Sequence, residues 1–436
     1  MSSGVPSADP SITVFGMRPL LKPTLTVGAA VMVVTTACTD DASTADDTVP
    51  DTAQASASET TEPTRESDGV LTIGILLPQT GEGGSIGNLG IAAATQAVNE
   101  INSAGGVLSG PVRLVIADEG STLEDAQAGV DSLLSQNVDA IVGPGSSLVA
   151  LDVLDQLMAA GVVTCSPIAT SMTLDDFPNR ELFFRTIPSD SLAAEGIAVQ
   201  AGRTGVTAAT VVYLDDGFAR PIARAVRTAL LENSIDPNPD VPLRPAGDDY
   251  AEVAQRLEAS EPGTIIVIAD SEHGWAMLSA MAEVFDDPPT IIVNDAMREP
   301  PAELVAALPE TFRTAIQGVS PLGTPQNLDD EPTGPFATNS YDCVNLIGLA
   351  SLVADSDQPA AIAAEIRRVA NEGAGCASFK DCVEAIDAGR GNIDYEGPWH
   401  RVTISAKGDS VPAYLMLFRF ADSGIAADAG TSRIGN

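Results

Sequence analysis

The chain has 436 residues, enough for two domains, and 44% of them are hydrophobic, so large buried cores are expected and global disorder is excluded. It contains 60 acidic and only 22 basic residues, which gives a formal net charge of −38 at pH 7. This charge excludes nucleic acid as a partner, because binding it requires a basic surface that neutralises phosphates. The acidity indicates a solvated, self-repelling surface.

A charge-free apolar run follows two basic residues near the N-terminus. Arg18 and Lys22 precede residues 24–37 (TLTVGAAVMVVTTA), which have the length of a signal-peptide core and are too short to span a bilayer comfortably. Export from the cytoplasm is therefore expected. Because Met17 begins a more typical signal, the sixteen residues ahead of it are interpreted as a start-site artefact.

Cys38 follows the apolar run directly. The small residues before it resemble the lipobox of bacterial lipoproteins, although Thr35 departs from the usual Leu or Val. We expect residues 1–38 to be a signal peptide that ends in a lipidated Cys38, and an ordinary signal peptide is the alternative. Residues 39–68 are mostly Thr, Ser, Ala, Asp and Glu and predict a disordered tether, because they bury too little apolar surface to offset their ordering entropy.

The other four cysteines fit an oxidising compartment. Cys376 and Cys382 lie six positions apart, a spacing that predicts a local disulfide. A metal site is the weaker alternative, because no histidine lies nearby and no CxxC motif occurs. Cys165 and Cys343 are interpreted as small buried hydrophobic residues.

From Val70 onward, short apolar runs alternate with longer amphipathic stretches. Residues 70–78 (VLTIGILLP) predict a buried strand because the run is nearly continuous, and the apolar residues of 91–101 fall at helical spacing. Strands are expected at 70–78, 112–118, 138–143 and 162–167, with helices at 91–101, 123–136 and 148–160. This order predicts a parallel sheet covered on both faces.

The same rhythm restarts after residues 183–190 and predicts a second α/β lobe. Strands are expected at 208–216, 264–270 and 290–295, with helices at 192–202, 219–232, 250–259 and 273–284. Helices at 340–352 and 359–371 follow, and then a hairpin in which 401–405 and 413–420 flank the turn Lys407-Gly408-Asp409. Because these elements come after both lobes are complete, we expect the chain to cross between the lobes more than once. Ligands in open parallel sheets bind outside the carboxyl ends of the strands, so two such lobes that face each other predict a ligand cleft.

The stretch Gly143–Ser147 (GPGSS) joins a predicted strand to a predicted helix, an arrangement that binds anions. A dinucleotide site would need a third glycine and an acid at the end of the next strand, which ends instead in Cys165-Ser166. A phosphate-binding loop would need Gly-Lys, which the sequence lacks. No nucleotide cofactor is therefore expected.

The sequence contains few candidate catalytic residues. The sequence has two histidines, His273 and His400, and both are interpreted as surface or capping residues. The pair Asp215-Asp216 follows a predicted strand and is interpreted as a ligand contact or a helix cap. No metalloprotease, nucleophile-elbow or calcium-loop motif occurs. The sequence therefore favours a binding protein over an enzyme, with no cofactor and no metal.

The order and wording of several motifs resemble one family. The motifs, in chain order, are IGILLPQTG, AVNEINSAGGVLSGPVRLVIADEGS, VGPGSS, CSPIATS, FFRTIPSD, VVYLDDGFA, SYDCVNLIGLA and CASFKDCVEAIDAGRGNIDYEGP. Over residues 70–420 the chain is similar to the substrate-binding proteins of ABC transporters for branched-chain amino acids, the leucine-binding or type I periplasmic family. The resemblance implies an α/β fold of two Rossmann-like lobes with parallel sheets, several hinge crossovers and a ligand cleft between the lobes.

The resemblance also implies a domain division and partners. Lobe I is expected to comprise residues 70–190 and 320–395, lobe II residues 191–319 and 396–422, and a tail residues 423–436. The expected partners are a small polar ligand, such as an amino acid or an amide, and the membrane subunits of an ABC permease. A ligand-sensing lipoprotein and an exported Rossmann-like enzyme are the alternatives.

The family's ligand site carries over residue by residue. The resemblance places the ligand carboxylate on the turns after the third and fourth strands and the ammonium against an acid of the second lobe. The expected ligand residues are Ser146, Ser147, Ile168, Ala169, Thr170, Phe218, Asp295 and Thr80. Phe218 replaces a common tyrosine and His400 a common glycine, so the ligand need not be leucine.

Overall fold

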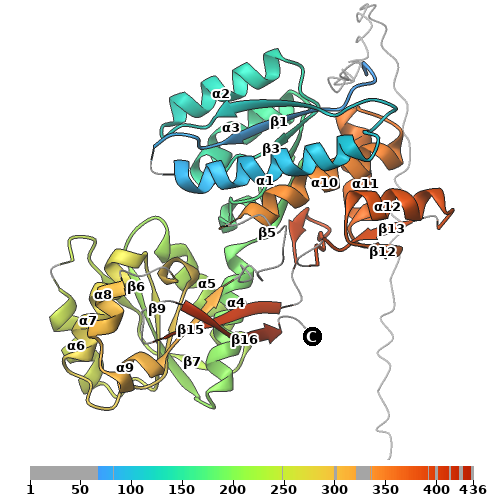
Figure 1. The fold of residues 1–436 in the computed structure, drawn as a ribbon. Coiled ribbons are helices and arrows are strands. Elements are labelled where there is room, and N and C mark those ends of the chain that lie inside the picture. Colours follow the sequence, from blue (N-terminus) through green and yellow to red (C-terminus); the bar gives the residue numbers. More distant parts are fainter. Residues whose placement is uncertain are drawn as a thin grey trace, which may run out of the picture. The chain divides into compact units, whose positions relative to one another are not determined.

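The structure is a computed structural model that describes residues 67–436, except 82, 248, 299–301, 321–333, 335, 391, 398–400, 412–413, 422–425 and 434–436. The predicted signal peptide, Cys38, nearly all of the predicted tether and His400 lie outside the described residues. Two main sheets, each with its own helices, make up the described part (Figure 1). In that part of the chain, no helix combines the length and apolar character needed to cross a membrane.

The first sheet has six strands in the order β14-β5-β4-β3-β1-β2, and all neighbours are parallel. The strands are β1 (Thr72–Leu77), β2 (Arg113–Asp118), β3 (Ala140–Val142), β4 (Val163–Ser166), β5 (Phe183–Pro188) and β14 (Asp409–Ser410). Every residue of β1, β3, β4 and β5 is buried, as expected for a parallel sheet covered on both faces. The predicted strands and the parallel sheet of this lobe are confirmed.

Within the described residues, six α-helices and a separate two-stranded sheet complete the first lobe (Figure 1). The helices are α1 (Gly84–Ser103), α2 (Leu123–Ser135), α3 (Ser147–Ala159), α10 (Ala337–Ala354), α11 (Pro359–Val369) and α12 (Phe379–Asp387). A short helix η1 (Met172–Leu174) follows β4, and β12 (Ala374–Cys376) pairs with β13 (Ile393–Tyr395). Helix α10 is buried over most of its length because α1 and α11 pack against it.

The second sheet has the order β16-β15-β11-β10-β9-β6-β7, and β8 also pairs with β6. The strands are β6 (Ala208–Leu214), β7 (Asp236–Pro237), β8 (Val241–Leu243), β9 (Thr264–Ile268), β10 (Ile291–Val293), β11 (Ile316–Ser320), β15 (Tyr414–Phe420) and β16 (Ala426–Arg433). The helices are α4 (Asp190–Arg203), α5 (Ala219–Glu232), α6 (Tyr250–Ala259), α7 (Ser271–Ala282), α8 (Ala302–Ala307) and α9 (Glu310–Ala315), with a short helix η2 (Asp295–Met297). The predicted second α/β lobe is confirmed.

The predicted C-terminal hairpin is wrong. Strand β15 pairs antiparallel with β11 and β16, whereas residues 401–405 contribute only an isolated bridge between Ile404 and Ser410. Residues 423–436 are not simply a tail, because β16 lies within them. The segment 396–422 is divided, since β14 joins the first sheet and β15 the second. Strand β16 (AADAGTSR) has no apolar run, so the sequence pattern gave no sign of it.

The interpretation of Cys165 and Cys343 as small buried residues is confirmed, and the structure adds a pairing that the sequence did not predict. Both are buried, and they form a disulfide between β4 and α10 with a Cα–Cα distance of 5.7 Å. The two cysteines are 178 positions apart, so only the packing of α10 against β4 brings them together. The predicted disulfide between Cys376 and Cys382 is confirmed.

Candidate functional site

The strands of the first sheet end together at one edge. The register aligns Ile75 of β1 with Val142 of β3, Val142 with Cys165 of β4, and Ser166 of β4 with Arg185 of β5. The loops that leave these strand ends carry all the expected ligand residues of the first lobe. In open parallel sheets, ligands bind at this edge.

The anion bound to the turn after β3 is a carboxylate of the chain itself. Oε2 of Glu119 accepts the N–H of Gly145 at 2.6 Å, and Oε1 accepts the N–H of Ser146 at 2.7 Å. Glu119 is 1% exposed, and this burial raises the pKa of its carboxyl while the two N–H donors oppose the rise. One N–H on each oxygen is the pattern of an ionised carboxylate. These two N–H groups are therefore already bound within the protein.

The turns after β3 and β4 are joined by two serine side chains. Oγ of Ser166 donates to the carbonyl of Pro144 at 2.7 Å and accepts the N–H of Ala169 at 3.0 Å. Oγ of Ser147 accepts the N–H of Ser171 at 3.2 Å, which leaves its hydroxyl proton to be donated elsewhere. The two turns thus form one unit that presents a hydroxyl donor at Ser147.

The neighbouring expected residues have mostly structural contacts. Ser146 is the N-cap of α3, and its Oγ accepts the N–H of Val149 at 3.5 Å. Ile168 is half-buried and packs against the core of the first lobe, and Ala169 is fully buried. Thr80 donates its hydroxyl to Oδ2 of Asp118 at 2.7 Å, which ties together the loops after β1 and β2.

Arg185 supports the turn after β4 from within the protein. Its side chain is fully buried, and Nη1 donates to the carbonyls of Ala169 at 3.3 Å and Ser171 at 3.1 Å. The same guanidinium pairs with Asp175 at 2.5 Å and with Asp409 of β14 at 2.7 Å. A buried guanidinium requires such partners, because an unpaired buried charge is strongly destabilising. Arg185 is a positioning residue for the turn.

Asp190, which the sequence analysis did not single out, contacts the expected ligand residue Thr170. It is the first residue of α4, its N–H donates to the carbonyl of Thr170 at 2.9 Å, and the Thr170 hydroxyl is hydrogen-bonded to its carboxylate. Burial raises the pKa of Asp190 to about 7, and the carboxylates of Asp175 and Asp295 add to the rise. Thr170 and Arg185 act in the opposite direction. The available signal was its position, an acid two residues after the end of a fully buried strand.

The expected second-lobe residues also lie at strand ends. Phe218 precedes α5 after β6 and is 43% exposed, and the half-buried Asp295 begins η2 after β10. Strand β9 lies between β6 and β10, so both residues occupy the same edge of the second sheet. Asp295 acts electrostatically on Asp190, which links this acid to the first-lobe residues.

The capping interpretation of Asp216 is confirmed. Its Oδ1 accepts the N–H groups of Phe218 at 3.0 Å and of Ala219 at 2.7 Å. The ring of His273 is held at the start of α7 by the carboxylate of Asp270, with Nδ1 2.8 Å from Oδ2, and by the carbonyl of Pro245. The hydrogen bond to Asp270 raises the pKa of His273. Within the described ranges, no group of three or more acidic, histidine or cysteine side chains is arranged to hold a metal ion.

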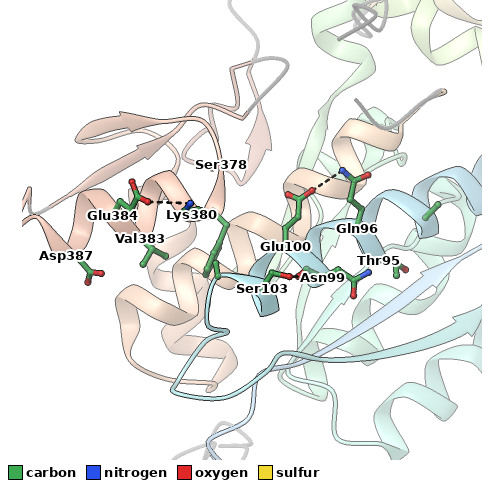
Figure 2. Close-up of a pocket in the computed structure, with 13 residues that line it drawn as sticks. Thr95, Gln96, Asn99, Glu100, Ser103, Ser378, Lys380, Val383, Glu384 and Asp387 are labelled. Carbon is green, nitrogen blue, oxygen red and sulfur yellow. Dashed lines mark hydrogen bonds and ion pairs between the residues drawn. The ribbon is translucent and has the colours of Figure 1, made fainter. Parts of the chain in front are cut away.

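A groove of about 1160 Å³ lies apart from these residues, between α1 and α12 (Figure 2). Gln96 and Glu100 are hydrogen-bonded on the α1 side, and Lys380 lies 3.9 Å from Glu384 on the α12 side. None of the expected ligand residues lines this groove. It is therefore a separate surface feature.

The two lobes and the residues at their strand ends define a type I periplasmic binding fold. Residues 70–325 match the family described as "Periplasmic binding protein", and the chain belongs to this family. Members of this family are solute-binding proteins.

Named relatives and solved structures agree with this fold. The chain is 27% identical to the "Leu/Ile/Val-binding protein BraC3" of Rhizobium johnstonii over 194 residues, which is 44% of this chain and 52% of the relative. It thus spans about half the length of this curated relative. An ABC transporter substrate-binding protein of Desulfitobacterium hafniense in complex with Leu has a TM-score of 0.64 at 21% identity, covering 82% of this chain and 99% of that one. A solute-binding protein of R. palustris in complex with benzoate has a TM-score of 0.59 at 14% identity, covering 84% and 98%.

Proposed function

We propose that the chain is an extracytoplasmic solute-binding protein of an ABC transporter and captures a small zwitterion, an amino acid or a close analogue, for import. The observation that carries this proposal is the pairing of unlike groups at one sheet edge. Ser147 offers a hydroxyl donor, whereas Thr170 and Asp190 offer acceptors. A ligand with a carboxylate and an ammonium satisfies both kinds of group at once.

The donor side fits a carboxylate. The Ser171 N–H uses one of the two lone pairs of Ser147 Oγ and leaves the hydroxyl proton to be donated to a ligand oxygen. Ser147 is also the first residue of α3, where the helix dipole favours negative charge.

The acceptor side fits an ammonium. The hydroxyl of Thr170 donates its proton to the Asp190 carboxylate, so its oxygen can only accept, and it is assigned here to a ligand N–H and not to the ligand carboxylate that the family resemblance implies. The carboxylates of Asp190 and Asp295 repel each other when both are ionised, which is why Asp295 raises the pKa of Asp190. A ligand ammonium bound between the two carboxylates relieves this repulsion. Together with Phe218, Asp295 forms the second-lobe side of the proposed site.

The relatives support an amino-acid-like ligand. The curated relative is described as Leu/Ile/Val-binding, and one solved neighbour contains Leu. Another neighbour contains benzoate, which shares only the carboxylate with an amino acid. The carboxylate half of the site is therefore the more general feature, and Asp190 with Asp295 selects for the ammonium.

A thermal-shift screen tests the proposed function. The purified chain is screened against the twenty amino acids, their amides, short peptides and aromatic acids, because a ligand that binds only the folded state raises the Tm. We expect at least one zwitterion to raise the Tm in a concentration-dependent way. No shift with any zwitterion, together with a shift from an uncharged compound, would contradict the proposal.

We also propose that the protein is exported and anchored through a lipid on Cys38. This proposal rests on the lipobox-like sequence and on the acidic, polar stretch between Cys38 and the folded body. The body begins with a fixed segment, since Oδ2 of Asp357 accepts the N–H groups of Asp68 at 3.0 Å and Gly69 at 2.7 Å. In cells that export the chain, Cys38→Ser should move it from the membrane fraction to the soluble fraction. An unchanged distribution would contradict the lipid anchor.

A further inference from the structure

We propose that Glu119 determines the charge specificity of the ligand site. Its buried carboxylate fills the anion position of the turn before α3, so the site accepts a ligand with one carboxylate and disfavours a ligand with a second anionic group. This inference rests on the proposed function, because it concerns the ligand held by the same turn.

Glu119 occupies the position that an external anion would take at the turn before α3. Its two oxygens accept the N–H groups of Gly145 and Ser146 at 2.6 Å and 2.7 Å, and the residue is 1% exposed. The Ser146 N–H belongs to the N-cap of α3 and the Gly145 N–H to the residue before it, so the carboxylate lies at the helix start, where an oxyanion is favoured. A second ligand anion therefore finds these donors already occupied by a negative charge.

The side chains around the proposed ligand carry mainly negative charge. Glu119, Asp190 and Asp295 all contribute carboxylates to the site or lie directly behind it. The nearby buried guanidinium, Arg185, is paired with two carboxylates, those of Asp175 and Asp409. The charge of Arg185 is thus bound to the protein's own acids.

Arg298 of the second lobe lies three positions after Asp295 and keeps its charge. Its guanidinium donates to Oγ of Ser320 at 3.3 Å and lies 5.5 Å from the centre of the Phe418 ring, so both contacts hold it against the second lobe. The carboxylates of Glu119, Asp190 and Asp295 outnumber this cation, so the local charge favours a zwitterion or a cation over a dicarboxylate, since like charges in a partly buried site repel strongly.

Glu119 also positions Ser147. It binds the backbone of the two residues that precede Ser147, and so fixes the conformation in which the Ser147 hydroxyl reaches Ser171. Two substitutions separate the charge from the reach of the side chain. Glu119→Gln keeps the size and one acceptor oxygen but removes the charge and places an amide nitrogen opposite the second N–H, whereas Glu119→Asp keeps the charge and both acceptors and shortens the reach.

The test measures affinities for matched probes by calorimetric titration. The probes are glutamine and glutamate, and asparagine and aspartate, which differ within each pair mainly in charge. The proteins are the full chain, Glu119→Gln, Glu119→Asp and the control Glu124→Gln, which removes an exposed carboxylate five positions away. We expect the amide-to-acid affinity ratio to fall at least tenfold in Glu119→Gln, and to stay within about twofold of the unsubstituted chain in the other two variants.

A second arm does not depend on knowing the ligand. In Glu119→Ala the N–H groups of Gly145 and Ser146 lose their anion, so inorganic sulfate should raise the Tm of this variant more than that of the unsubstituted chain at equal ionic strength. Circular dichroism first establishes that each variant is folded, and Glu119→Ser, which also empties the anion position, replaces Glu119→Ala if the alanine variant is not.

The outcomes separate the two proposals. An unchanged amide-to-acid ratio in a folded Glu119→Gln variant, or an equal effect of sulfate on both chains, would overturn the role of Glu119. If no zwitterion binds the unsubstituted chain, the proposed function fails, while the sulfate arm still decides whether Glu119 occupies the anion position.

Discussion

Oγ of Ser147 accepts the N–H of Ser171 at 3.2 Å, and this contact joins the turn after β3 to the turn after β4. The two turns therefore form one hydrogen-bonded unit, and the buried Arg185 donates to the carbonyls of Ala169 and Ser171. Five of the eight expected ligand residues carried over from the family lie within or directly beside this unit, namely Ser146, Ser147, Ile168, Ala169 and Thr170.

Replacing Ser147 should lower the affinity for the ligand. Ser147→Ala removes the hydroxyl donor and the Ser171 contact, and one such hydrogen bond to a charged group corresponds to roughly tenfold in affinity. Titration of the ligand found in the screen measures the loss. Ser103→Ala, on the exposed end of α1, is the matched control and should bind as the unsubstituted chain does. Equal affinity in both variants would show that Ser147 does not contact the ligand.

Ligand affinity should depend on pH through Asp190. Its pKa is raised to about 7, and an ammonium binds the ionised carboxylate, so affinity should fall as the pH drops below about 7. A single titrating group gives at most a tenfold loss per pH unit. The groups that act on Asp190 are the carboxylates of Asp175 and Asp295, the guanidinium of Arg185 and the hydroxyl of Thr170.

The ligand-free protein should show the opposite trend. The pKa of Asp190 is higher in the folded state than the 3.8 of an unperturbed aspartate, so the folded state binds the proton more tightly. The free energy of unfolding should therefore decrease as the pH rises from about 4 to about 7. Asp190→Asn should remove this component and flatten the pH dependence of ligand affinity. A pH profile that is the same in both proteins would contradict the assignment.

Breaking the buried ion pairs of Arg185 should destabilise the fold strongly. Arg185→Met leaves the carboxylates of Asp175 and Asp409 without their shared cation, and losing one partner of a buried pair costs about 3–5 kcal/mol. The exposed pair of Arg256 and Glu252 provides a control, because Arg256→Met should change the free energy of unfolding by less than about 1 kcal/mol. Denaturant unfolding measures both values. Similar losses in the two variants would show that burial does not set the difference.

The two disulfides should differ in their contribution to stability. Cys165 and Cys343 close a loop of 178 positions, and Cys376 and Cys382 close one of six. Loop-closure entropy assigns about 5 kcal/mol to the first disulfide and about 2 kcal/mol to the second. The double alanine variants should therefore lower the Tm in that order. The reverse order would indicate that local contacts, and not chain entropy, dominate.

The strands and helices of both lobes could be predicted because their signals are local. Residues 70–78 form a nearly continuous apolar run, and β1 is buried at every position. Strand β16 gave no such signal, because it is a polar strand paired only with β15. The pairing of Cys165 with Cys343 depends on α10 packing against β4, which no local pattern describes.

The candidate site could be predicted only in part. The turn Gly143–Ser147 was recognised as an anion site, but its anion was assigned to a ligand, whereas the structure shows Glu119 bound to Gly145 and Ser146. The sequence separates Glu119 from the turn by more than twenty positions, so only the pairing of β1 with both β2 and β3 brings them together. Asp190 was missed for a similar reason, since its partner Thr170 follows a different strand.

The most direct test of the proposed site is a calorimetric titration of the full chain with three forms of one ligand. The forms are the amino acid that gives the largest thermal shift, its N-acetyl derivative and its carboxamide. Because the site pairs a donor at Ser147 with acceptors at Thr170 and Asp190, we predict that each blocked form binds at least tenfold more weakly than the zwitterion. Equal affinity for the amino acid and its N-acetyl derivative would contradict the ammonium site at Asp190 and Asp295, and with it the proposed class of ligand.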